Sequence, residues 1–317
     1  MNMCFPISRG WLLIFLTLAL ATPGLAQTNA PATNSVSGEA PPTGGLVTLR
    51  DVVIGKGGTQ DLHADITYRQ NATQPMPAVI WIHGGGWISG TYHDGPIIPL
   101  ARAGYFAASI EYRLSNVAKW PAQIQDCKLA VRWLRANAAK YNVDPNRIGV
   151  WGASAGGHLV ACLGTMGDVK EYEGDGGYPG TSSAVQAVVD YFGPTDFTNP
   201  DIFSTTGAKG AVTGLFEVPY AQNPDLWKSA CPLFYVKVGD PPMFLVHGDS
   251  DGTVPLEQSI VLDQALTKAD VPHQFLIVKN GDHGFRPKPG TTIDPGLGDI
   301  QKAVFDFFDK YLKTSAK

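Results

Sequence analysis

The chain has 317 residues, of which 44% are hydrophobic and 16% are charged. This length is enough for one large α/β domain or two small ones with a buried core. The 24 Lys and Arg residues against 28 Asp and Glu residues give a net charge of -4, so the chain lacks the basic balance of nucleic-acid-binding proteins. We therefore expect no nucleic-acid partner.

The N-terminus predicts an export signal. Arg9 supplies a positive charge, residues 11–20 form an apolar run, and Ala26 closes a stretch of small residues that suits cleavage. The apolar run is short for a membrane anchor, which is the alternative. We predict a signal peptide over 1–26 and a disordered Ala-, Pro- and Ser-rich linker over 27–45. The domain at 46–317 is then expected to be secreted or periplasmic, without stable membrane insertion.

Beyond the linker, strand and helix patterns alternate, which predicts one α/β domain with a mainly parallel sheet and helices on both faces. The predicted strands are 46–54, 62–68, 78–82, 106–112, 147–151, 185–191, 242–247 and 274–278. The predicted helices are 94–103, 121–141, a helix from His158 onward, 256–269 and 299–312. Residues 197–233 break the alternation and predict a small lid or pocket wall, with an irregular surface excursion as the alternative.

Three cysteines, Cys127, Cys162 and Cys231, follow the predicted signal. Export would permit one disulfide with a free thiol left over. Alternatively, Cys127 and Cys162 are small buried hydrophobes, since they lie in helix-like apolar surroundings. Their spacing gives no indication of a metal site.

A short motif, Gly152-x-Ser154-x-Gly156, lies between a predicted strand and a predicted helix. This is the context in which a serine becomes an exposed nucleophile on a sharp turn. The dipole of the following helix favours negative charge that develops there. The alternative is an ordinary Gly- and Ser-rich connection, so partners must be found elsewhere in the chain.

A base and an acid follow in the order that such a serine requires. Asp251 lies in the loop after the seventh predicted strand, with Asp249 as the competing carboxylate. His283 lies between Gly and Asp residues directly after the last predicted strand, whereas the other histidines fall in strands, in the helix or before a helix. We predict Ser154, Asp251 and His283 as a catalytic triad.

The run Gly84-Gly85-Gly86 follows a buried strand, where bare backbone N–H groups can approach a substrate closely. No Lys-Ser/Thr pair follows, so the run is not a phosphate loop. We predict that the N–H groups of Gly85, Gly86 and Ala155 form an oxyanion hole. His83 is expected to brace this loop rather than to act as a base.

Taken together, four motifs resemble the α/β-hydrolase superfamily, in its HGGG-bearing esterase/lipase branch. They are His83-Gly84-Gly85-Gly86-Trp87, Gly152-Ala153-Ser154-Ala155-Gly156-Gly157, the loop Gly248…Asp251…Val254-Pro255, and Asp282-His283-Gly284-Phe285. The sequence segments at 111–114, 125–134 and 144–148 further resemble those of bifunctional acetylxylan/feruloyl esterase-like enzymes. The resemblance spans about 47–312. Cys231 departs from it, because a serine would be expected before Pro232.

The resemblance implies a three-layer fold with an eight-stranded, mostly parallel sheet and a Ser-Asp-His triad. It implies ester hydrolysis through an acyl-enzyme, without a cofactor or metal. Arg113 and Asp126 lie in the segments that resemble the family, and we interpret both residues as structural. We expect a secreted serine carboxylesterase acting on acetyl or feruloyl esters of plant polysaccharide, or on similar short-chain or aromatic esters. The alternatives are an arylformamidase-like amide hydrolase, a lipase, a prolyl-oligopeptidase-type peptidase, or a non-catalytic binding module.

Aromatic residues near the motif ends are candidates for an acyl pocket. We predict Trp87, Tyr92 and Tyr191 as substrate-binding residues, and Trp120 and Phe192 as further candidates. The alternative is that these rings pack in the core or at its rim, as aromatic residues at strand ends commonly do.

Overall fold

A computed structural model describes residues 45–200, 203 and 206–313, with no side-chain description for 206 and 207. The predicted signal peptide, and the predicted linker up to residue 44, lie outside the described residues. Over the described ranges, no helix combines the length and apolar character needed to cross a membrane.

A single eight-stranded sheet organises the domain from residue 45 onward, in the order β1-β2-β4-β3-β5-β6-β7-β8. β1 pairs with β2, and β2 with β4, in antiparallel fashion, and all later neighbours are parallel. The mostly parallel sheet predicted from the sequence is therefore confirmed. The strands are β1 (Leu46–Gly57), β2 (Gln60–Arg69), β3 (Met76–Ile82), β4 (Phe106–Ile110), β5 (Val143–Ala153), β6 (Ala187–Tyr191), β7 (Met243–Gly248) and β8 (His273–Val278).

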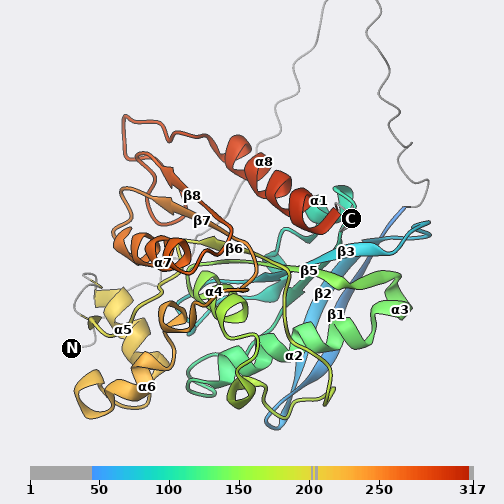
Figure 1. Cartoon of the computed structure of the whole chain (residues 1–317), viewed down its shortest axis with the longest axis horizontal. Coiled ribbons are helices and arrows are strands. Elements are labelled where there is room, and N and C mark those ends of the chain that lie inside the picture. Colours follow the sequence, from blue (N-terminus) through green and yellow to red (C-terminus); the bar gives the residue numbers. More distant parts are fainter. Residues whose placement is uncertain (1–44, 201–202, 204–205, 314–317) are drawn as a thin grey trace, which may run out of the picture. The chain divides into compact units, whose positions relative to one another are not determined.

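Helices cover both faces of this sheet (Figure 1). They are α1 (Ile97–Arg102), α2 (Ala122–Ala136), α3 (Ala138–Tyr141), α4 (Ala155–Thr165), α5 (Thr206–Leu215), α6 (Pro224–Lys228), α7 (Glu257–Lys268) and α8 (Leu297–Phe308). Side chains alternate between the faces along each strand. Val150 belongs to the buried core that includes residues of α2, α4 and α7, whereas its neighbour Trp151 belongs to the core that includes residues of α1 and α8. The three-layer prediction is confirmed.

Two predicted helices differ from those observed. The predicted helix at 121–141 is divided at Asn137 into α2 and α3, and Asn137 turns its side-chain amide back to the carbonyl of Trp133. The predicted helix at 94–103 begins only at Ile97, after a single 3-10 turn, because Gly95 and Pro96 separate the two.

The segment at 197–233 carries α5 and α6, which lie at the lower left of Figure 1. Val212, Leu215 and Phe216 of this segment join the larger of the two hydrophobic cores. The three cysteines of the described domain are free and buried, so none forms the disulfide that export would permit.

Parallel strands bring their carboxyl ends to one edge of the sheet, and ligands of open α/β sheets bind outside that edge. The loops after β3, β5, β7 and β8 all emerge there. These are the loops that carry the glycine run, Ser154, Asp251 and His283.

Candidate active site

Ser154 lies on a strained turn between β5 and α4. Its φ of 57° and ψ of −120° are unfavourable for a residue with a side chain. The turn is tight, and at two of its glycines a side chain would collide with backbone atoms of neighbouring residues. A Cβ on Gly152 would lie 2.3 Å from the carbonyl oxygen of Gly156, and one on Gly156 would lie 2.1 Å from that of Ile82. The small residues of the motif therefore permit the strain that exposes Ser154.

His283 connects Ser154 to Asp251. Its Nε2 lies 2.9 Å from Oγ of Ser154, and its Nδ1 lies 2.7 Å from Oδ2 of Asp251. The three residues come from loops after β5, β7 and β8, far apart in the sequence. Because Nδ1–H donates to the carboxylate, Nε2 is left as an acceptor for the serine hydroxyl proton.

Asp251 is surrounded by donors. Its side chain is fully buried, and Oδ1 accepts the N–H groups of Thr253 and Val254 at 2.7 and 2.9 Å. The buried His247 lies 3.3 Å from Oδ2. Burial is the largest influence and would raise the pKa of the Asp251 carboxyl, but the hydrogen bonds of His247 and His283 outweigh it and hold that pKa well below its usual value. Asp251 therefore stays charged.

The competing carboxylate, Asp249, has a different role. Its Oδ1 accepts the N–H of Asn280 at 2.7 Å, so it ties the loop after β7 to the loop that carries His283. The structure thus brings Asp251, and not Asp249, to the imidazole.

The predicted oxyanion loop lies beside Ser154. Gly85 and Gly86 have φ values of 106° and 60°, which glycine adopts at little cost. Ala155 is the first residue of α4. In the described part of the chain, the N–H groups of Gly85, Gly86 and Ala155 donate to no acceptor, so all three are available to a substrate oxygen. His83 packs flat on Tyr112 and turns Nδ1 to the carbonyl of Gly84 at 2.8 Å, which braces the loop.

Trp87 connects the end of this loop to α4, the helix that begins beside Ser154. Its φ is 60°, and its indole N–H donates to Nδ1 of His158 at 3.2 Å. Nε2 of His158 lies 2.7 Å from the carbonyl of Ala230, so the imidazole is neutral with its proton on Nε2. Burial lowers the pKa of His158 to about 4, against a smaller opposing influence of the Ala230 carbonyl. Loop, helix and the 197–233 segment are thereby joined through one buried side chain.

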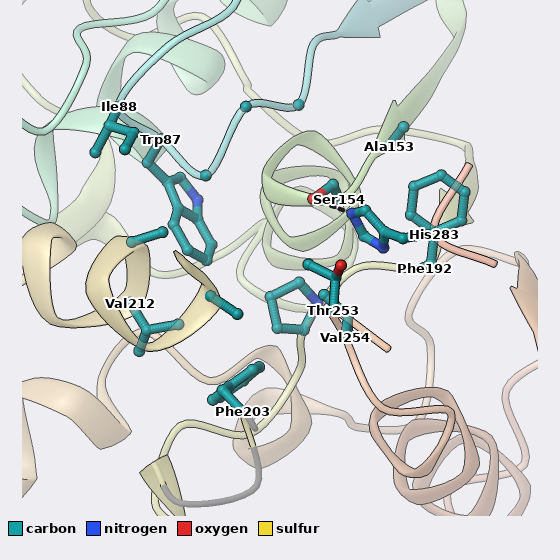
Figure 2. A pocket seen from close by; sticks show the side chains of 16 residues that line it. Trp87, Ile88, Ala153, Ser154, Phe192, Phe203, Val212, Thr253, Val254 and His283 are labelled. Carbon is teal, nitrogen blue, oxygen red and sulfur yellow. Dashed lines mark hydrogen bonds between the residues drawn. The ribbon is translucent and has the colours of Figure 1, made fainter. Parts of the chain in front are cut away.

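A pocket of about 460 Å³ opens above Ser154 (Figure 2). Its size is typical of a small-molecule site. Its lining is almost entirely apolar. It is formed by Gly84, Gly85, Gly86, Trp87, Ile88, Ala153, Ser154, Phe192, Pro194, Phe203, Ala208, Ala211, Val212, Thr253, Val254 and His283.

Of the aromatic residues predicted to bind substrate, Trp87 and Phe192 line this pocket, whereas Tyr92, Tyr191 and Trp120 do not. Tyr92 donates its hydroxyl to Asp51 at 2.6 Å on the surface. Tyr191 packs on the other face of the sheet, against Trp151 and Phe285.

Trp120 is buried and donates its indole N–H to Ser229. Rim and core packing explain all three rings that do not line the pocket.

Among the described residues, the side chains grouped closely enough to hold a metal ion lie away from the pocket. Asp51, Asp65 and His93 lie close enough together to hold an ion, but Asp65 is already paired with Arg50, and none of these residues lines the pocket. Arg113 and Asp126 form a bidentate ion pair, as expected of a structural contact.

Sequence reasoning missed two features of the site. The first is which residues of 197–233, predicted as a possible lid or pocket wall, line the pocket. Ala208, Ala211 and Val212 of α5 do so, at helical i, i+3, i+4 spacing. That spacing was a weak signal, because alanine is common in any helix. The second is the support given by His158 and His247, which are buried with both ring nitrogens engaged.

Residues 64–266 match the model of the BD-FAE family. Esterase LipQ of Mycobacterium tuberculosis is 32% identical over 74% of this chain and 56% of its own length, so the chain spans little more than half of this curated relative. Among solved structures, a truncated carbohydrate esterase from gut microbiota has a TM-score of 0.74 and 33% identity, over 84% of this chain and 97% of that one. An acetyl ester-xyloside bifunctional hydrolase from Caldicellulosiruptor lactoaceticus has a TM-score of 0.63 and 30% identity, over 80% and 86%. The chain belongs to the BD-FAE family.

Proposed function

We propose that the chain is a serine carboxylesterase that hydrolyses carboxylic esters through an acyl-enzyme. One observation carries the proposal: His283 lies within hydrogen-bonding distance of both Ser154 and the buried carboxylate of Asp251. A nucleophile, a base and a group that orients the base are thus in contact, and the nucleophile and the base line an apolar pocket.

In the first half of the reaction, Nε2 of His283 takes the hydroxyl proton of Ser154 as Oγ bonds to the ester carbonyl carbon. The carbonyl electron pair moves onto the oxygen, which the N–H groups of Gly85, Gly86 and Ala155 receive. The carbonyl then re-forms, the bond to the alkoxy oxygen breaks, and the imidazolium gives its proton to the departing alcohol.

In the second half, His283 takes a proton from water, whose oxygen attacks the acyl carbon of the acyl-enzyme. The tetrahedral oxyanion forms again in the same hole. Its collapse releases the carboxylic acid and returns the proton to Ser154. The charged Asp251 stabilises the imidazolium in both halves, and each hydrogen-bond donor of the hole contributes on the order of 3 kcal/mol to the transition state.

We further propose that the natural substrates are acetyl or feruloyl esters of plant polysaccharide, or similar short-chain or aromatic esters. Support comes from two structural neighbours, one described as a carbohydrate esterase and one as an acetyl ester-xyloside hydrolase. Secretion or a periplasmic location, expected from the apolar run at 11–20, would bring the enzyme to such substrates.

A panel of acetylated xylan, methyl ferulate and p-nitrophenyl esters tests the proposal with wild-type protein and Ser154→Ala. Ser182→Ala is a matched control, because this serine is exposed and outside the pocket. We expect wild-type and Ser182→Ala to hydrolyse at least one ester at equal rates, and Ser154→Ala to show only a trace. Undiminished hydrolysis by Ser154→Ala would refute the proposal.

A further inference from the structure

The pocket extends to both sides of Ser154, and the chemistry assigns a part of the substrate to each side. The alcohol that leaves must accept its proton from Nε2 of His283, so it lies on the His283 side. The acyl substituent of the tetrahedral carbon points away from the leaving oxygen. In Figure 2, Trp87 and His283 lie on opposite sides of Ser154, and Phe203 and Val212 lie on the side of Trp87.

The side away from His283 is a compartment without polar side chains, which we call the acyl compartment. It is lined by Trp87, Phe203, Ala208, Ala211 and Val212. The only hydrogen-bonding group among these side chains, the indole N–H of Trp87, is already donated to His158. Nothing in this lining can therefore bind a charge or replace the water around a hydroxyl group.

We propose that the acyl compartment selects esters whose acyl group is uncharged, apolar and larger than acetyl, with α5 setting its depth. This inference rests on the proposed esterase function and names its substrate class more narrowly. It disfavours the acetyl esters proposed above, which are too small to fill the compartment, and the feruloyl esters, whose phenolic hydroxyl would have no partner there. An acetyl group would leave the compartment empty, whereas each methylene that enters it leaves water and contacts the two rings and α5. The alcohol part, including a sugar, remains on the His283 side.

The depth of the compartment depends on small residues of α5. This helix packs directly on the oxyanion loop, because a Cβ on Gly86 would lie 2.9 Å from Cβ of Ala211. Ala211 is buried and Ala208 is half-buried. A larger side chain at position 208 would occupy the space that the acyl group needs, without the close approach to Gly86 that position 211 has.

The opposite side of α5 offers a matched control. Thr213 is exposed and does not line the pocket, although it lies on the same helix. Thr213→Leu adds apolar bulk to α5, as Ala208→Leu does, but outside the compartment. Any effect of the helix as a whole would appear in both variants.

The test compares kcat/KM for p-nitrophenyl acetate, butyrate and hexanoate, and for the charged p-nitrophenyl hemisuccinate. For wild-type protein we expect about a 10-fold rise from acetate to butyrate, and hemisuccinate at least about 10-fold below butyrate. In Ala208→Leu the hexanoate-to-acetate ratio should fall about 10-fold, while in Thr213→Leu it should match wild-type. Methyl cinnamate and methyl hexanoate distinguish an aromatic from a linear acyl group.

Three results would overturn the inference: a wild-type preference for acetate over both longer esters, equal turnover of hemisuccinate and butyrate, or the same ratio in Ala208→Leu and Thr213→Leu. If Ala208→Leu does not fold, Val212→Ala replaces it and should raise the hexanoate-to-acetate ratio, since it enlarges the compartment. An unchanged ratio there counts against the inference. Failure of wild-type protein on every ester would instead contradict the esterase function itself.

Discussion

The indole N–H of Trp87 donates to Nδ1 of His158 at 3.2 Å, which joins the oxyanion loop to the helix that begins beside Ser154. Trp87 has a positive φ that a tryptophan adopts only when its surroundings hold it there. Phe197 packs edge-on against both rings. The predicted oxyanion loop is therefore held to the helix after Ser154 through His158, a residue that does not line the pocket.

Replacing Trp87 with Phe should lower kcat more than it raises KM. The phenyl ring keeps most of the packing but leaves Nδ1 of His158 without its donor, which costs about 1–3 kcal/mol of unfolding free energy. A displaced oxyanion loop can cost up to about 100-fold in rate. Steady-state kinetics on one p-nitrophenyl ester measures the effect. Trp133→Phe, a buried tryptophan outside the pocket, is the control, and equal losses in both variants would contradict this role.

His158 should make the protein less stable in acid. Its pKa is about 4 in the folded chain and 6.5 in the unfolded chain, so the unfolded chain binds more protons between these values. The contribution of His158 to the unfolding free energy is therefore complete above about pH 6.5. It is lost as the pH drops toward 4, by at most about 3 kcal/mol. Denaturant unfolding at several pH values should show a shallower fall in His158→Gln. An identical slope in both proteins would exclude His158 as the cause.

Asp251→Asn should reduce kcat by about 10⁴-fold with little change in fold. The amide cannot hold the imidazole with its proton on Nδ1 or stabilise the imidazolium. Asp249→Asn is the matched control, because Asp249 contacts Asn280 instead of His283. We expect a much smaller loss there, measured by kcat with circular dichroism as a check on folding. Comparable losses would mean that the two carboxylates act together.

The acid side of the pH–rate profile should show a single protonation. The pKa of the Asp251 carboxyl is held well below its usual value, so this group stays charged in mild acid. A loss of activity as the pH decreases therefore comes from a group other than Asp251. The profile of kcat/KM is the measurement. A second acidic step would show that another group, such as the carboxylate, titrates as well.

The sequence was sufficient to predict the fold class and to single out Ser154, Asp251 and His283. Each of these residues directly follows a strand in a glycine-containing loop, and parallel strands bring such loops to one edge of the sheet. The positions and spacing of strands along the chain are properties that a single sequence carries in its hydrophobic pattern.

The sequence indicated 197–233 as a possible pocket wall but was not sufficient to predict which residues line the pocket. Tyr191 and Phe192 are neighbours, yet only Phe192 lines the pocket, because the backbone turns after β6 and sends the two rings in different directions. Tyr92 is held at the surface by Asp51, which lies 41 positions away in the sequence. The alanines of α5 gave no distinctive signal, since their contribution is the space that they leave free.

The most direct test of Ser154 as the nucleophile is covalent labelling with a fluorophosphonate, followed by mass spectrometry of the peptides. The phosphorus bonds to Oγ as fluoride leaves and His283 takes the proton, so labelling requires the same contacts as ester cleavage. We predict one label per chain, on Ser154, with none in Ser154→Ala and slow labelling in His283→Ala. A wild-type chain that is not labelled, or that is labelled on another residue, would contradict the central claim.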